Sequence, residues 1–285
     1  MKFAILITTK GKENLEKAIS SVLGSKLPIY VVTPEKHYKD LEQKYKNIKI
    51  INDKKEGKAS AINLAIKNIK EDVIIFTDGD VYIKKGSISY ITKIFQNKKV
   101  GGVTGKVISL NSKDDILGYW SHFLVECANT LRKDLQKKNK YFEMTGYLMA
   151  ARKNLIDEIP KEALSEDGYI SQCVHSKGYN IVYEEKAVVY VKYPTNFKDW
   201  IIQKRRSAGG YTQNFIDKEK SNRSFGKETR NGFKNFFKYP KTIKERYYLI
   251  LLFLSRIYLW MVIFRDIKIK KLPFAKIWKD VKSTK

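Results

Sequence analysis

Val73-Ile74-Ile75-Phe76-Thr77-Asp78-Gly79-Asp80 is an unbroken apolar run that ends in two carboxylates flanking a glycine. A short β-branched run followed by a polar break predicts a strand that is buried on both faces. Ligands of open α/β sheets bind beyond the carboxyl ends of the strands, so Asp78 and Asp80 are expected at the mouth of a site. Two carboxylates one residue apart suit a hard divalent cation that also holds a diphosphate, although a plain acidic turn has the same short pattern.

Apolar runs and amphipathic stretches alternate on both sides of this strand. Before it, we expect strands over Lys2–Thr9, Leu27–Thr33 and Ile48–Ile51, and helices over Asn14–Leu23, Lys36–Tyr45 and from Gly57 onward. After it, we expect strands over Val100–Val107, over Tyr141–Ala151 with an interruption at Thr145-Gly146, and over Asn180–Tyr183 and Ala187–Val191. We expect helices over Asp115–Lys137, Glu166–Ser176 and from Thr195 or Asp199. Such alternation predicts an α/β fold built from βαβ units around a mostly parallel sheet.

The composition narrows the class of protein without choosing a function. With 285 residues, 43% of them apolar, the chain can bury a substantial core. A formal charge of +26 implies an anionic partner, which can be nucleic acid, anionic lipid or a phosphorylated substrate. Cys127 and Cys173 do not suggest a disulfide framework, and the three histidines lack zinc spacing. The chain enters its first predicted strand at once, without a signal-peptide pattern.

Six short features that suit phosphates or carry carboxylates follow one another along this α/β chain. They are Thr8-Thr9, Gly57-Lys58-Ala59-x-Ala61-x-Asn63, Asp78-Gly79-Asp80, Thr145-Gly146, Ser165-Glu166-Asp167 and Gln203-x-x-Arg206. Over about residues 1–211 this order resembles the family 2 glycosyltransferases of GT-A fold, especially the membrane-associated branch with cellulose, chitin and hyaluronan synthases. The resemblance implies a Rossmann-like nucleotide-sugar-binding half (1–105), an acceptor-binding and catalytic half (106–215) and membrane-associated helices (216–285).

The resemblance also implies a role for each motif. Donor binding would fall to Thr8, Thr9, Glu13, Gly57, Lys58, Asp78, Gln203 and Arg206. Asp80, with Asp78, would hold Mg²⁺ or Mn²⁺ against the donor diphosphate. Asp167 would act as the general base, with Glu166 as its supporting neighbour. Thr145 and Gly146 would lie beside the acceptor.

The implied reaction is the inverting transfer of a hexosyl or N-acetylhexosaminyl group from a UDP- or GDP-sugar to a glycan or lipid-linked acceptor. At the end of the second predicted strand the family commonly has an aspartate that contacts the nucleobase. This chain has Pro34 and Glu35 there instead, so the sequence does not choose between UDP and GDP. Its Gln-x-x-Arg-Trp pattern ends here in Ser207, which favours the addition of one or a few sugars over processive synthesis. Two alternatives are a polyprenyl-phosphate glycosyltransferase and a basic, non-catalytic protein that binds nucleic acid or glycan. Nucleic acid is the weaker partner because the cations are dispersed and no recognised motif is present.

The C-terminal region combines a basic aromatic stretch, Asn231–Tyr248, with an apolar run, Tyr247–Phe264. The first is typical of an interfacial anchor on anionic lipid. The second is slightly short for a spanning helix and contains Arg256, which costs roughly 2.5–3.5 kcal/mol to insert. A single transmembrane helix, an in-plane hairpin and a buried soluble helix all stay open. The flanking cations predict that the catalytic part faces the cytoplasm, at the membrane surface.

Overall fold

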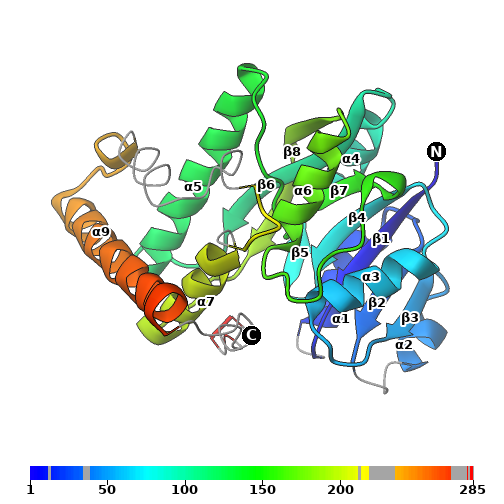
Figure 1. Cartoon of the computed structure of the whole chain (residues 1–285), viewed down its shortest axis with the longest axis horizontal. Coiled ribbons are helices and arrows are strands. Elements are labelled where there is room, and N and C mark those ends of the chain that lie inside the picture. The colour runs from blue at the N-terminus through cyan, green and yellow to red at the C-terminus, as the bar shows by residue number, and fades with distance from the viewer. Residues whose placement is uncertain are drawn as a thin grey trace. The chain divides into compact units, whose positions relative to one another are not determined.

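The chain, described by a computed structural model over residues 1–11, 14–34, 39–210, 213–217, 235–270, 281 and 283–284, divides into two compact units. The first unit comprises Met1–Val107 and Tyr141–Val191, and the second comprises Ile108–Lys140 and Lys192–Lys285. Figure 1 colours and labels the elements of both units along the chain.

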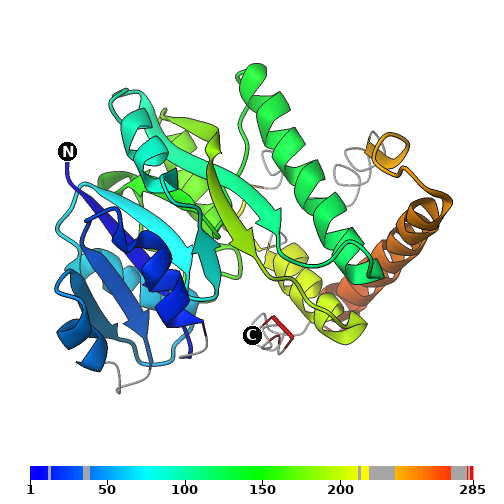
Figure 2. The same ribbon diagram turned by 180° about the vertical axis from the view of Figure 1, so that it is seen from behind.

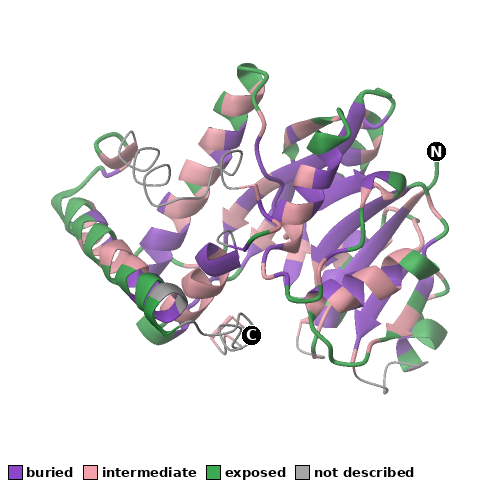
Figure 3. Cartoon of the chain, viewed as in Figure 1, coloured by how far each residue is buried: buried purple, intermediate pink, exposed green. Residues whose placement is uncertain are grey.

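The N-terminal part of the first unit is the predicted parallel βαβ arrangement. Its elements are β1 (Phe3–Thr8), α1 (Leu15–Leu23), β2 (Ile29–Thr33), α2 (Lys39–Lys44), β3 (Ile48–Asn52), α3 (Lys58–Asn68) and β4 (Val73–Asp78). Strand β1 pairs in parallel with β2 on one side and with β4 on the other, and β2 pairs in parallel with β3. Five residues of β4, from Val73 to Thr77, are buried, as its unbroken apolar sequence predicts. Figure 3 shows this burial across the sheet.

The rest of the first unit makes the sheet mixed rather than mostly parallel. It contains β5 (Val81–Ile83), α4 (Ser87–Ile94), β6 (Val100–Ser109), β7 (Met149–Arg152), the 3-10 turn η1 (Lys153–Leu155), α6 (Glu166–Ser176) and β8 (Asn180–Val191). Strand β7 is antiparallel to β4 and β6, and β5 is antiparallel to β8. The eight-stranded order is β3-β2-β1-β4-β7-β6-β8-β5, with helices on both faces, as Figures 1 and 2 show from opposite sides.

Two strand predictions were wrong in this region. Of the strand expected over Tyr141–Ala151 with an interruption at Thr145-Gly146, only the part after the interruption is a strand, β7. Before it, side chains rather than a neighbouring strand accept the N–H groups of Met144 and Thr145. Thr145 donates its N–H to Thr104 Oγ1 at 3.0 Å, and Met144 donates to Ser171 Oγ at 2.9 Å. The two strands expected over 180–191 are one strand, β8, whose polar middle is partly exposed. Strand β5 and helix α4 were not predicted.

The described residues of the second unit form three long helices and a π-helical turn. These are α5 (Ile116–Lys137), α7 (Phe197–Gly210), α9 (Ile243–Phe264) and the π-helical turn η2 (Arg265–Ile269). Helices α5, α7 and α9 share a buried cluster made by Leu117, Tyr119, Trp120, Phe123, Trp200, Leu249 and Leu252. Helix α5 begins one residue after the predicted Asp115. Helix α7 begins between the two predicted starts, where Asn196 Oδ1 accepts the Asp199 N–H at 2.9 Å.

Candidate functional site

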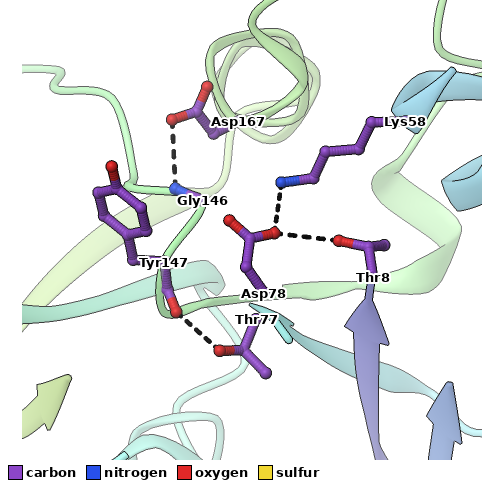
Figure 4. Close-up of polar contacts among 7 residues, drawn as sticks. All are labelled: Thr8, Lys58, Thr77, Asp78, Gly146, Tyr147 and Asp167. Carbon is purple, nitrogen blue, oxygen red and sulfur yellow. Dashed lines mark hydrogen bonds and ion pairs between the residues drawn. The ribbon is translucent and has the colours of Figure 1, made fainter. Parts of the chain in front are cut away.

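The carboxyl ends of β1 and β4 bring Thr8 and Asp78 side by side, because the parallel register pairs these two residues directly. Thr8 Oγ1 donates a hydrogen bond of 3.0 Å to Asp78 Oδ1. Lys58 Nζ reaches the same oxygen at 2.5 Å from the first turn of α3. Figure 4 shows both contacts converging on Asp78. A charged, half-buried carboxylate with a hydroxyl and an ammonium therefore lies where open α/β sheets bind ligands.

Lys58 owes its position to Gly57, which has a φ of +99° immediately before α3. Few residues other than glycine adopt that conformation without strain. Burial lowers the pKa of Lys58, but the charges of Asp78, Glu166 and Asp167 outweigh it and hold that pKa above its usual range. Lys58 is consequently a permanent cation among three carboxylates. The most distant of these in the sequence, Asp167, lies 109 positions after Lys58.

Asp167 lies in the first turn of α6 and accepts several hydrogen bonds. Its Oδ2 accepts the Gly146 N–H at 3.2 Å, and its Oδ1 accepts the Gly168 N–H at 2.9 Å and the Ser165 hydroxyl at 3.3 Å. A Cβ added to Gly146 would lie 3.6 Å from the Asp167 Cβ, so this backbone passes close beside the carboxylate. These three donors fix the orientation of the Asp167 carboxylate.

The segment that carries Gly146 is tied to β4 as well. Thr77 Oγ1 donates to the Tyr147 carbonyl oxygen at 2.9 Å, as Figure 4 shows. Thr145 itself is buried, and it donates its N–H to Thr104 Oγ1. Residues 145–147 therefore connect β4 to the first turn of α6, and the N–H of Gly146 is the part of this segment that meets Asp167.

Glu166, next to Asp167, has a raised pKa. Burial is the largest cause and the charges of Asp167 and Asp78 add to it, while the charge of Lys58 opposes them. Glu166 therefore takes up a proton at a higher pH than a solvent-exposed glutamate.

Gly79 separates the two aspartates because there is no room for a side chain. A Cβ at this position would lie 2.7 Å from the Thr9 Cβ and 2.8 Å from its Oγ1, and the Gly79 N–H bonds the Thr8 carbonyl at 3.0 Å. Asp80, just beyond, is exposed. Among the described residues no group of three or more His, Cys, Asp or Glu side chains is arranged to hold a metal ion. Asp78 and Asp80 nevertheless suit Mg²⁺ or Mn²⁺, since magnesium is commonly bound by one or two carboxylates with substrate phosphates.

The remaining motif residues lie elsewhere. Gln203 and Arg206 are half-buried on α7, in the second unit. The side-chain oxygen of Gln203 is buried and has no hydrogen-bond partner within the described part of the chain. Glu13 lies outside the described residues. The structure thus brings Thr8, Lys58, Asp78, Gly146, Glu166 and Asp167 together within the first unit.

Asn63 is a residue whose role was not predicted. Its Nδ2 donates to the Ile159 carbonyl at 2.7 Å, and its Oδ1 accepts the Ile159 N–H at 3.0 Å. These two bonds fasten the segment that precedes α6 to helix α3, which carries Lys58. An amide on a largely inward-facing part of an amphipathic helix was the available signal, because such a group needs hydrogen-bond partners.

Comparisons with known proteins find similarity to glycosyltransferases. A family model described as "Glycosyltransferase like family 2" matches residues 9–210. The probable glycosyltransferase YdaM of Bacillus subtilis is 26% identical over 180 residues, which are 60% of this chain and 43% of that protein. The poly-beta-1,6-N-acetyl-D-glucosamine synthase of Staphylococcus aureus is 25% identical over 217 residues, 70% of this chain and 52% of that protein. The chain thus spans about half the length of these curated relatives.

Two solved structures have the same fold. One is residues 1–349 of S. aureus TarS in complex with UDP-GlcNAc, with a TM-score of 0.51 and 14% identity over 85% of this chain and 77% of that one. The other is GalNAc-T7 with UDP, GalNAc and Mn²⁺, with a TM-score of 0.51 and 14% identity over 84% of this chain and 57% of that one. The expected GT-A fold is confirmed by these neighbours.

Proposed function

Because the chain belongs to glycosyltransferase-like family 2, we propose that it transfers a sugar from a nucleoside-diphosphate sugar to an acceptor hydroxyl, with inversion at the anomeric carbon. The observation that carries the proposal is the convergence of Lys58, Asp78 and Asp167 at the carboxyl end of β4. The first two residues suit an anionic nucleotide, and the third suits proton transfer. In this proposal, residues for nucleotide binding and a residue for proton transfer therefore lie within one unit.

In this proposal Asp167 is the general base. The acceptor oxygen attacks the anomeric carbon while the bond from that carbon to the diphosphate oxygen breaks, and the electron pair leaves with the nucleoside diphosphate. The acceptor proton passes to the Asp167 carboxylate. Support comes from the hydrogen bonds of Gly146, Ser165 and Gly168, which hold that carboxylate in one orientation.

The donor would be held by Thr8, Thr9, Gly57, Lys58 and Asp78, with Glu13, Gln203 and Arg206 as further proposed contacts. Lys58 supplies a fixed positive charge for the nucleotide or its phosphates. Asp78 and Asp80 would hold Mg²⁺ or Mn²⁺, which neutralises charge on the departing diphosphate. One relative is named a poly-beta-1,6-N-acetyl-D-glucosamine synthase, and TarS was solved in complex with UDP-GlcNAc. UDP-GlcNAc is therefore the first donor to test, followed by other UDP- and GDP-sugars.

For the acceptor we propose a lipid-linked glycan presented at the cytoplasmic face of a membrane, with Thr145 and Gly146 on the acceptor side. The apolar helix α9 and the charge of +26 support this location.

The test is UDP and GDP binding by calorimetry, with Mn²⁺ and then with a chelator. We expect binding of one nucleotide that depends on Mn²⁺ and is lost in Asp80→Ala. The matched control is Asp40→Ala, which removes an exposed aspartate from α2 and should bind as the wild type does. If the folded wild type binds neither nucleotide, the proposed function is wrong. If binding is indifferent to the chelator and to Asp80→Ala, the metal site is wrong.

A further inference from the structure

Helix α9 has two apolar sides, and among the described residues of the second unit only one of these sides is covered by packing. Leu249, Leu252, Leu259 and Ile263 are buried, packing in the clusters that α9 shares with α5 and α7. On the other side, Ile250, Leu254 and Met261 are 50%, 54% and 57% exposed. Tyr247, Phe253, Tyr258 and Phe264 are exposed as well. Figure 3 shows exposed residues along much of α9.

The exposed residues form one continuous stripe along the helix. Ile243, Tyr247, Ile250, Leu254, Tyr258 and Met261 follow one another at steps of three or four, which keeps them on one face of a helix with 3.6 residues per turn. Arg256 lies about 120° around the helix from Ile250, outside this stripe. We call the six residues the outer stripe. It runs for most of a helix about 33 Å long.

The packing of α9 fits neither a soluble core helix nor a spanning one. The helix is long and apolar enough to cross a membrane, yet only 22% of its most apolar window is buried, which is low for a core helix. Its inner side is fastened to the same unit. Trp120 Nε1 donates to the Tyr248 carbonyl at 2.7 Å, and Arg205 pairs with buried Asp266 at 2.8 Å just past its end. Spanning would break these contacts and expose Asp266.

Cations border the outer stripe at both ends. Lys241, Lys244 and Arg246 are exposed near its start, and Arg265 and Lys270 near its end. A second copy of the chain packed stripe to stripe would bring like charges together in either orientation. Anionic lipid headgroups complement both ends, while the uncharged stripe between them suits the acyl region just below.

We propose that the outer stripe docks flat on an anionic bilayer, with α9 in the plane of the membrane. Helix α7 packs on the inner side of α9 through Ala208, which contacts the cluster of Leu259 and Ile263. Docking would therefore place the helix that carries Gln203 and Arg206 at the membrane. That this brings donor-binding residues to the membrane rests on the proposed function. The docking itself does not, because it needs no donor or acceptor.

Flotation with vesicles tests the docking. We expect the full chain to float with vesicles that contain phosphatidylglycerol and not with pure phosphatidylcholine. Leu254→Asp should weaken the binding by about tenfold or more, because it replaces an apolar contact with a charge. Tyr90→Asp is the matched control, since Tyr90 is an exposed aromatic on α4. It should float as the wild type does.

Two results would overturn the proposal: a folded wild type that never floats, or a folded Leu254→Asp variant that floats unchanged. Either result leaves the nucleotide-binding test untouched, so the failure of the docking is distinguishable from the failure of the proposed function.

The orientation needs a second measurement. In a background with Cys127→Ser and Cys173→Ala, Lys241→Cys and Lys270→Cys place single thiols at the two ends of α9. An impermeant thiol reagent added outside vesicle-bound protein should label both variants to the same extent, since an in-plane helix keeps both ends on one side. Labelling of one end only means that α9 spans the bilayer and overturns the in-plane orientation.

Discussion

Asp167 is the residue on which the proposed chemistry most depends. Asp167→Asn keeps the shape of the side chain and an oxygen for the Gly146 N–H, but it removes the base. With a hydroxyl acceptor we expect the transfer rate to fall by about 10²–10⁴-fold while nucleotide binding persists. Transfer assays and calorimetry on the same preparation measure both quantities.

The same variant separates two acceptor classes. A polyprenyl phosphate is already an anion and needs little help from a base. A small loss in Asp167→Asn, beside a large loss in Asp80→Ala, would favour that alternative over the hydroxyl acceptor.

The raised pKa of Glu166 predicts that the free energy of unfolding depends on pH. The pKa is raised in the folded chain, so the stabilisation relative to the unfolded chain is present below the ordinary glutamate pKa and is lost as the pH rises through the raised value. Glu166→Gln has no charge to bury. We expect this variant to be more stable than the wild type at neutral pH, with the difference disappearing in acid. Thermal unfolding across this pH range measures it, and a difference that is constant with pH would contradict the assignment.

Gly79 tests the tight turn between the two aspartates. Gly79→Ala forces a methyl group against Thr9, so we expect a loss of about 1–3 kcal/mol in the free energy of unfolding. Gly24→Ala is the control, because nothing lies within 4 Å of a Cβ added at exposed Gly24. It should stay within about 0.5 kcal/mol of the wild type. Equal urea midpoints for the two variants would contradict the crowding argument.

At the scale of elements, α3 and the segment before α6 are fastened together by Asn63. Asn63→Ala leaves the backbone groups of Ile159 without these partners, and we expect a loss of about 1–3 kcal/mol. Asn68→Ala is the control on the same helix, because within the described residues the amide of exposed Asn68 bonds only to the Leu64 carbonyl of its own helix. Hydrogen exchange at residues 156–165 should rise in the first variant only. Unchanged exchange there would mean that other contacts hold the segment.

The elements show which predictions a sequence supports. Helices α5 and α6 and strand β4 lie where they were predicted. Helix α5 has an apolar periodicity, β4 is an unbroken apolar run, and α6 has two acids in its first turn and Gly178 after its end. The first part of the strand expected over Tyr141–Ala151 is not a strand, because the distant side chains of Ser171 and Thr104 accept the N–H groups of Met144 and Thr145. The contact of Thr8 with Asp78 depends on the pairing of β1 with β4, and no local pattern states it. The exposure of one side of α9 likewise depends on how α5 and α7 cover the other.

For the whole molecule, the charge of +26 predicts binding to any polyanion, so binding alone does not identify the partner. Salt separates the contribution of charge contacts to binding from the contribution of apolar contacts. Raising the ionic strength shortens the screening length from about 10 Å at 0.1 M to about 3 Å at 1 M, which weakens charge contacts and leaves apolar ones. We expect binding to phosphatidylglycerol vesicles to keep a component in high salt, while binding to RNA loses nearly all of its strength. In Leu254→Asp, vesicle binding should become more salt-sensitive than in the wild type, because part of the apolar contact is lost while the charge contacts remain. If wild-type binding to vesicles and to RNA falls equally steeply with salt, the outer stripe does not touch the bilayer, and the charge alone accounts for the association.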